Sequence, residues 1–179
     1  MYTYVFAFFL LTASFFNSLP AHAEDELSGA VDSVILGALA HEISSDEEGG
    51  ADANLEIRFR PLFGHDWAIE ILPTVGGTVN FSGDTNTAYA GATARYRLTE
   101  SFYLEGFFGF TVHDADTPTD ANGLDLGCTL LFREGAGIGY QRGKHSISAF
   151  ISHASHGDIL CDDENDGMTS AGLRYGYHF

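Results

Sequence analysis

Basic residues are scarce in this chain of 179 residues. It contains 8 Lys and Arg against 25 Asp and Glu, which gives a formal net charge of −17. A nucleic-acid-binding surface needs a basic face to neutralise phosphates, so no nucleic-acid partner is expected. Two interpretations of the acidic excess stay open: it keeps the chain soluble, or it faces divalent cations held on an anionic surface.

Long hydrophobic runs are absent after the N-terminal segment. Residues 5–16 are almost wholly apolar, and residues 21–23 (Ala-His-Ala) form a small-x-small cleavage site before an acidic stretch. This pattern predicts a cleaved signal peptide at residues 1–23. A membrane anchor is the alternative, but the run is shorter than the roughly 20 residues of a spanning helix. The mature chain, residues 24–179, has a length that suits one domain.

Helical periodicity is hard to find, and proline is limited to 4 residues. Instead, apolar and polar residues alternate with a period of two, as in β-strands. For example, Leu55 and Ile57 share one face of a strand, and Glu56 and Arg58 share the other. Most of the expected strands are long enough to cross a bilayer core when tilted. These strands are residues 30–42, 53–61, 66–79, 87–98, 102–113, 126–141, 145–155 and 168–179.

The connections between these strands alternate between long and short. Long polar connections are expected at residues 43–52, 80–86, 114–123 and 156–167. Long loops on one rim and short turns on the other are typical of an outer-membrane barrel. A soluble ligand-binding barrel is the alternative, but its apolar face would point inward. Here one face carries charges that suit a filled polar interior, so the sequence predicts an all-β, eight-stranded antiparallel outer-membrane β-barrel.

One pair of residues suggests chemistry. His153 and Ser155 are two residues apart on the strand at 145–155, so their side chains project from the same face. That face also carries Ile147 and Ile151, which indicates that the pair looks toward lipid. A Ser hydroxyl becomes nucleophilic when a neighbouring His takes its proton. The alternative is a polar strand end without catalytic function.

The C-terminal segments resemble a known family. His153-Ala-Ser155, Cys161, residues 165–169 (Asn-Asp-Gly-Met-Thr) and residues 172–179 resemble the PagL-like lipid A 3-O-deacylases, also called acyloxyacyl hydrolases. Further similar segments lie upstream, at residues 36–41, 51–54, 83–85, 89–91, 112–114 and 126–134.

This resemblance implies an active site on the outer, lipid-facing wall of a barrel in the bacterial outer membrane, reached after signal-peptide export. The implied substrate is lipid A of lipopolysaccharide, which loses the acyl chain esterified at its 3-position. Ser155 would be the nucleophile and His153 the general base. Lipid A and outer-membrane lipids are the expected partners, and the oligomeric state stays open.

Two positions depart from the family pattern. The family motif continues after Ser155 with an Asn that helps form the oxyanion hole, and His156 is expected to donate in its place. The family's orienting acid aligns near Thr169, and Asp166 is expected to replace it, with Glu164 and Asp163 as alternatives. These departures keep a second hypothesis open: a non-catalytic structural or adhesive outer-membrane barrel descended from the family.

The two cysteines are Cys128 and Cys161, an even count that predicts one disulfide in an exported chain. It would join the strand at 126–141 to the loop after Ser155. The His residues show no metal-ligand spacing, so no metal or other cofactor is expected. Aromatic residues expected to lie at the membrane interface are Trp67, Tyr96, Tyr175 and Tyr177.

Overall fold

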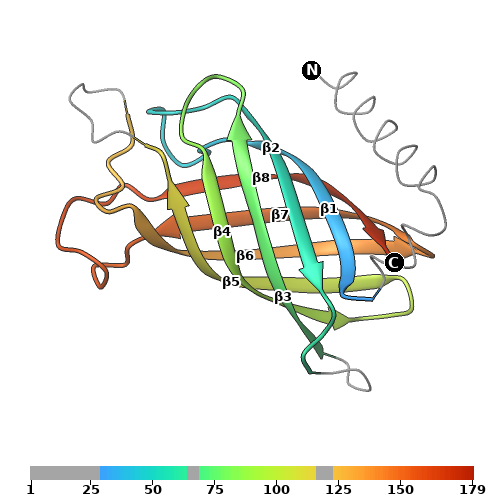
Figure 1. The fold of residues 1–179 in the computed structure, drawn as a ribbon. Helices are drawn as coiled ribbons and strands as arrows, with labels where there is room; N and C mark the ends of the chain where they lie inside the picture. The colour runs from blue at the N-terminus through green and yellow to red at the C-terminus, as the bar shows by residue number, and fades with distance from the viewer. Residues whose placement is uncertain (1–28, 64–68, 116–122) are drawn as a thin grey trace.

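The computed structural model describes residues 29–63, 69–115 and 123–179. Eight antiparallel strands form a closed barrel in which each strand pairs with the next and β8 pairs with β1 (Figure 1). The strands are β1 (Val31–Ala40), β2 (Ala51–Phe59), β3 (Ile69–Asn80), β4 (Thr87–Arg97), β5 (Phe102–His113), β6 (Leu130–Arg142), β7 (His145–Ser155) and β8 (Met168–His178). The predicted fold class is confirmed.

Some sequence-based expectations fall outside the described residues. They are the signal peptide at residues 1–23, the interface position of Trp67 and the first residues of the strand expected at 66–79. In the part of the chain that the structure describes, no helix is long and apolar enough to cross a membrane.

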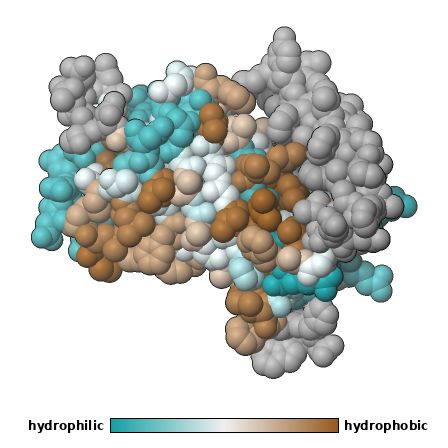
Figure 2. Space-filling view, in the orientation of Figure 1, coloured by the Kyte–Doolittle hydropathy of each residue, from teal (hydrophilic) through white to brown (hydrophobic). Residues whose placement is uncertain are grey.

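The alternating sequence sorts side chains between the two sides of the wall. On β2, Leu55 is 50% exposed, whereas its neighbour Glu56 is 2% exposed because it points into the barrel. On β5, Phe108 and Phe110 face outward, and Glu105 faces inward. Figure 2 shows hydrophobic residues gathered along the flank and hydrophilic residues at the end that carries the long loops. The outer surface is therefore an apolar belt.

Charged side chains fill the interior. Arg58 donates to Glu56 (Nε to Oε1, 2.7 Å) and to Glu105 (Nη1 to Oε2, 2.7 Å). Arg174 also pairs with both carboxylates, and its guanidinium lies 3.5 Å from the centroid of the Phe150 ring. Small barrels of eight strands have interiors that side chains can fill. This interior holds an ion-pair network where a soluble lipocalin-type barrel would have an apolar ligand cavity.

The largest difference from the predicted strand boundaries is at the start of β6. β6 begins at Leu130, not at residue 126, and the preceding residues belong to the loop between β5 and β6. Leu124 and Leu126 are buried against Leu131, together with Ala154 and Met168. The loop residues alternate like a strand because they cover the loop end of the barrel interior with apolar side chains. Gly127, with φ +69°, interrupts the extended backbone between this cover and β6.

Candidate active site

His153 and Ser155 lie at the loop end of β7, and both are half-buried on the outward face. The register places Glu134 of β6 and Thr169 of β8 directly opposite His153. Phe132 of β6 lies opposite Ser155. Directly opposed residues in an antiparallel sheet have neighbouring side chains on one face. The structure therefore brings His153 and Ser155 together on the outer wall, in a row with a carboxylate and a hydroxyl.

His153 contacts Thr169. The imidazole Nδ1 and the Thr169 hydroxyl are 2.9 Å apart, which leaves Nε2 for another partner. Within the described residues, no hydrogen bond joins His153 to Ser155. Such contacts are often loose in the absence of substrate and tighten in the reactive complex. The structure shows the two side chains on one face of β7, two residues apart.

Asp166, the expected orienting acid, is hydrogen-bonded to Asp125. Its Oδ2 accepts from the backbone N–H of Asp125 (2.8 Å), and its own N–H donates to the Asp125 carbonyl (2.9 Å). This reciprocal pair ties the loop after β7 to the loop before β6. The residue that the structure places against His153 Nδ1 is Thr169.

His156, the expected oxyanion donor, is completely buried. Its Nδ1 accepts from the Asp158 backbone N–H (3.1 Å), so Nε2 carries the ring proton in the neutral form. Nε2 lies 3.1 Å from the Asp163 carbonyl and 3.3 Å from the Glu164 carbonyl. Both ring nitrogens are used inside the loop after β7. The ring has no N–H left to face an oxyanion at Ser155.

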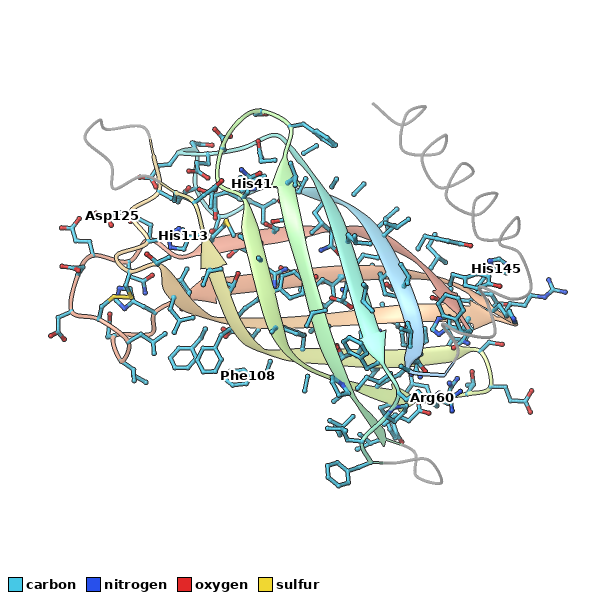
Figure 3. The ribbon with its side chains drawn as sticks, viewed as in Figure 1. His41, Arg60, Phe108, His113, Asp125 and His145 are labelled. Carbon is cyan, nitrogen blue, oxygen red and sulfur yellow. A yellow bond between two sulfur atoms is a disulfide. The ribbon has the colours of Figure 1, made fainter. Side chains whose placement is uncertain are left out.

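The predicted disulfide is confirmed. Cys128 and Cys161 are bonded, with their Cα atoms 6.3 Å apart. Cys128 lies two residues before β6, in the loop and not in the strand as expected. The disulfide and the pair of Asp125 with Asp166 fasten the same two loops at separate points. Figure 3 draws the disulfide at the same end of the barrel as His113 and Asp125.

An apolar groove of about 580 Å³ runs along the outer wall of β5 to β8. Its lining includes Ile151, which precedes His153 by two residues on the same face, and Ala171, which lies opposite Ile151. The lining also includes Leu104, Ala136, Ile138, Ala149 and Leu173. A groove of the same volume lies over β1 to β4. The two grooves have the same volume, so the groove over β5 to β8 is distinguished by its position near His153.

Glu42 is a further residue bonded to Thr169, and no sequence pattern indicates this contact. Its carboxylate Oε2 accepts the backbone N–H of Thr169 (2.7 Å). Glu42 lies two residues after the end of β1, among other acidic loop residues. No spacing rule could select it, because the contact joins residues 127 positions apart. Only the closure of β1 against β8 brings it behind Thr169.

Comparisons with known proteins agree with this fold. The family model of lipid A 3-O-deacylase (PagL) matches residues 49–178. The crystal structure of the outer membrane enzyme PagL has a TM-score of 0.62 and 18% sequence identity, covering 84% of this chain and 100% of that chain. The structure of the outer membrane protein Ail of Yersinia pestis in a nanodisc has a TM-score of 0.50 and 17% identity, covering 84% and 99%.

No curated protein matches the chain in sequence. At such low identities the two solved structures show the fold alone, whereas the family model matches the sequence itself over most of the chain, including β2 to β8. The chain belongs to the lipid A 3-O-deacylase (PagL) family.

Proposed function

We propose that this protein is an outer-membrane esterase, exported by its signal peptide, that hydrolyses the 3-position acyl ester of lipid A. The observation that carries the proposal is the location of His153 and Ser155 on the outer wall, at the head of an apolar groove. Polar side chains on a lipid-facing wall destabilise a barrel, so their presence there calls for a function. A substrate that is itself a membrane lipid reaches such a site from the bilayer.

The chemistry follows from the two side chains. Ser155 Oγ attacks the ester carbonyl carbon while His153 Nε2 takes the hydroxyl proton. The bond to the sugar oxygen then breaks, and Nε2 returns the proton to that oxygen. Water attacks the resulting acyl-Ser155 in the same way. The products are a 3-hydroxy fatty acid, a lipid A with one chain fewer and the regenerated Ser155.

The groove gives the acyl chain a place to lie. Its lining consists of aliphatic side chains and small residues along β5 to β8. Binding energy from the remote chain can position the ester against Ser155, which raises the rate of the chemical step. This geometry favours an ester near the loop end with its chain directed toward the middle of the barrel wall.

The first test is Ser155→Ala. We expect the variant to lose deacylation by about 10⁴-fold or more, because it removes the proposed nucleophilic hydroxyl. Mass spectrometry of lipid A from cells that express the wild-type chain should show the loss of one 3-hydroxyacyl group, and the variant should not. Ser152→Ala is the control, since Ser152 lies on the same strand with its side chain buried inside the wall. Both variants should keep heat-modifiable folding.

A non-catalytic structural or adhesive barrel is the second candidate. The observation that favours it is that no carboxylate among the described residues is hydrogen-bonded to His153, together with the use of His156 inside its loop. Ail, described as an attachment invasion locus protein, has a similar fold. An unchanged lipid A mass spectrum from cells with the folded wild-type chain would select this candidate.

A further inference from the structure

Glu42 is a buried carboxylate with a distinctive set of contacts. It is 4% exposed and has a φ of 34°, a left-handed conformation that non-glycine residues rarely adopt. Oε1 accepts the backbone N–H groups of Ser44 (2.6 Å) and Ser45 (2.9 Å) and the Ser44 hydroxyl. Oε2 accepts the backbone N–H of Thr169 (2.7 Å). Four donors converge on a group that can only accept when it is ionised.

No basic partner among the described side chains balances this charge. Glu42 takes part in no ion pair there, whereas the buried Glu56 and Glu105 pair with arginines and Asp52 pairs with His41. A buried carboxylate without a countercharge is costly even when it is hydrogen-bonded. The arrangement is stabilised if a positive charge forms nearby. The side chain on the other side of Thr169 that can become cationic is His153.

The hydroxyl of Thr169 cannot by itself set the state of His153. A hydroxyl either donates or accepts, whereas an ionised carboxylate only accepts. If Thr169 donates to Nδ1, the proton of neutral His153 sits on Nε2, and Nε2 cannot take the proton of Ser155. If Thr169 accepts from Nδ1, Nε2 is free to act as the base. Another group has to favour the tautomer that carries its proton on Nδ1.

We propose that Glu42 is a positioning residue that acts on His153 through Thr169. Its negative charge, held against the Thr169 backbone, favours the proton on Nδ1 and the imidazolium that forms when Ser155 is activated. Thr169 provides the contact and Glu42 provides the charge, so two residues replace one orienting acid. A second bond, from the Ile43 N–H to the Thr169 carbonyl (2.8 Å), fixes the two segments together. The inference rests on the proposed ester hydrolysis.

The other carboxylate in the row, Glu134, lies opposite His153 on β6. Its side chain is exposed on the lipid-facing wall, and among the described residues no hydrogen bond or ion pair joins it to His153. Glu42 is buried, and Thr169 bonds both Glu42 and His153. We therefore expect Glu42→Gln to have the larger effect on His153, with Glu134→Gln as a comparison.

Kinetics of deacylation in detergent micelles give the first measurement. Glu42→Gln should lower kcat by roughly 10-fold with KM changed less than about 2-fold, because the lost interaction is strongest in the transition state. Glu47→Gln is the matched control: it removes one exposed charge from the same loop and should leave kcat within about 2-fold. Thr169→Glu in the Glu42→Gln background places a carboxylate beside His153 and should restore most of the activity. A residue that only clamps its loop predicts no such rescue.

¹⁵N spectroscopy of histidine in the folded barrel gives the second measurement. Wild-type His153 should carry its proton on Nδ1, and Glu42→Gln should shift part of the population to Nε2–H. Thr169→Val should also shift it, and this variant keeps the backbone bond to Glu42, so it tests the inference even if Glu42→Gln does not fold. His153→Asn assigns the signals.

The two readouts separate the possible failures. If Glu42→Gln shifts the His153 tautomer but the wild-type barrel has no deacylase activity, the inference is kept and the proposed function is rejected. If Glu42→Gln lowers kcat but leaves the His153 tautomer unchanged, Glu42 acts only in folding its loop, and the inference is overturned. An unchanged tautomer with an unchanged kcat overturns it as well.

Discussion

Gly167 lies close to the Cε1 and Nε2 atoms of the His153 ring, whereas Thr169 contacts Nδ1. Its φ is +68°, which favours glycine. A Cβ at this position would lie 2.7 Å from Cε1 of His153 and 3.2 Å from Nε2. The first of these distances is too short for two carbon atoms, so any other residue here would move the ring. Glycine therefore suits both the backbone conformation at this position and the position of the His153 ring.

Gly167→Ala should lower kcat by roughly 10- to 100-fold, because displacement of a catalytic group by a fraction of an ångström is costly. Gly143→Ala is the control. Gly143 has a φ of +59°, but a Cβ added there would meet nothing within 4 Å, so it carries the backbone strain without the clash. Deacylation followed by mass spectrometry compares the two. Equal losses of activity would mean that backbone strain, not contact with His153, explains the effect.

At the residue scale, the sequence predicts which way a side chain points from a strand, but it does not predict the contacts of a side chain in a long loop. The shared outward face of His153 and Ser155 follows from the period of two. The expected roles of Asp166 and His156 depend on the course of residues 156–167. That course is set by distant partners, among them Asp125, which lies 41 positions from Asp166.

At the element scale, His41 fastens the loops of the rim. Its Nδ1 lies 2.9 Å from Asp52 Oδ1 at the start of β2, and its Nε2 lies 2.8 Å from Glu48 Oε2 in the loop between β1 and β2. Glu48 Oε1 in turn accepts the hydroxyl of Thr85 (2.9 Å), in the loop between β3 and β4. Burial lowers the pKa of His41, but the hydrogen bonds to Asp52 and Glu48 outweigh burial and raise it to about 9.

This raised pKa predicts how the stability of the barrel depends on pH. The folded state binds the His41 proton more tightly than the unfolded state, in which the pKa has its ordinary value of 6.5. The stabilisation is therefore complete below pH 6.5 and is lost as pH rises through about 9. Urea unfolding in detergent micelles at about pH 7 and about pH 10 brackets this loss. His41→Gln should flatten the decline between these pH values, and an equal decline in both proteins would exclude His41 as its source.

The strands themselves are predicted within a few residues, with β6 as the informative exception. Leu124 and Leu126 alternate with polar residues as a strand would, yet they cover the interior at the loop end. Periodicity reports that alternate residues are buried, but it does not report whether the chain carrying them pairs with a neighbouring strand. Pairing depends on the partner, and the register of β5 with β6 ends where Val112 meets Leu130.

At the scale of the whole molecule, the barrel is organised with apolar side chains outside and charged side chains inside. The apolar belt needs no protein partner in a bilayer, and closure of β8 on β1 gives every strand two neighbours. The interior has to satisfy its own charges. Glu105 is central to this requirement because it pairs with both Arg58 and Arg174. The sequence predicts that these charges face inward, but not which residues pair across the barrel.

Glu105→Gln should therefore destabilise the barrel far more than a change on the outer side of the same strand. The variant leaves two buried guanidinium groups short of a charged partner, and breaking a buried ion pair costs about 3–5 kcal/mol. Leu104→Ala is the matched control, because Leu104 is adjacent on β5 and 42% exposed on the outward face. Urea unfolding in lipid vesicles, followed by heat modifiability, measures both free energies of unfolding. If the two variants lose similar stability, the strand pairing and the apolar belt stabilise the barrel without help from the interior charges. A larger loss in Glu105→Gln would show that the charged interior holds opposite walls of the barrel together.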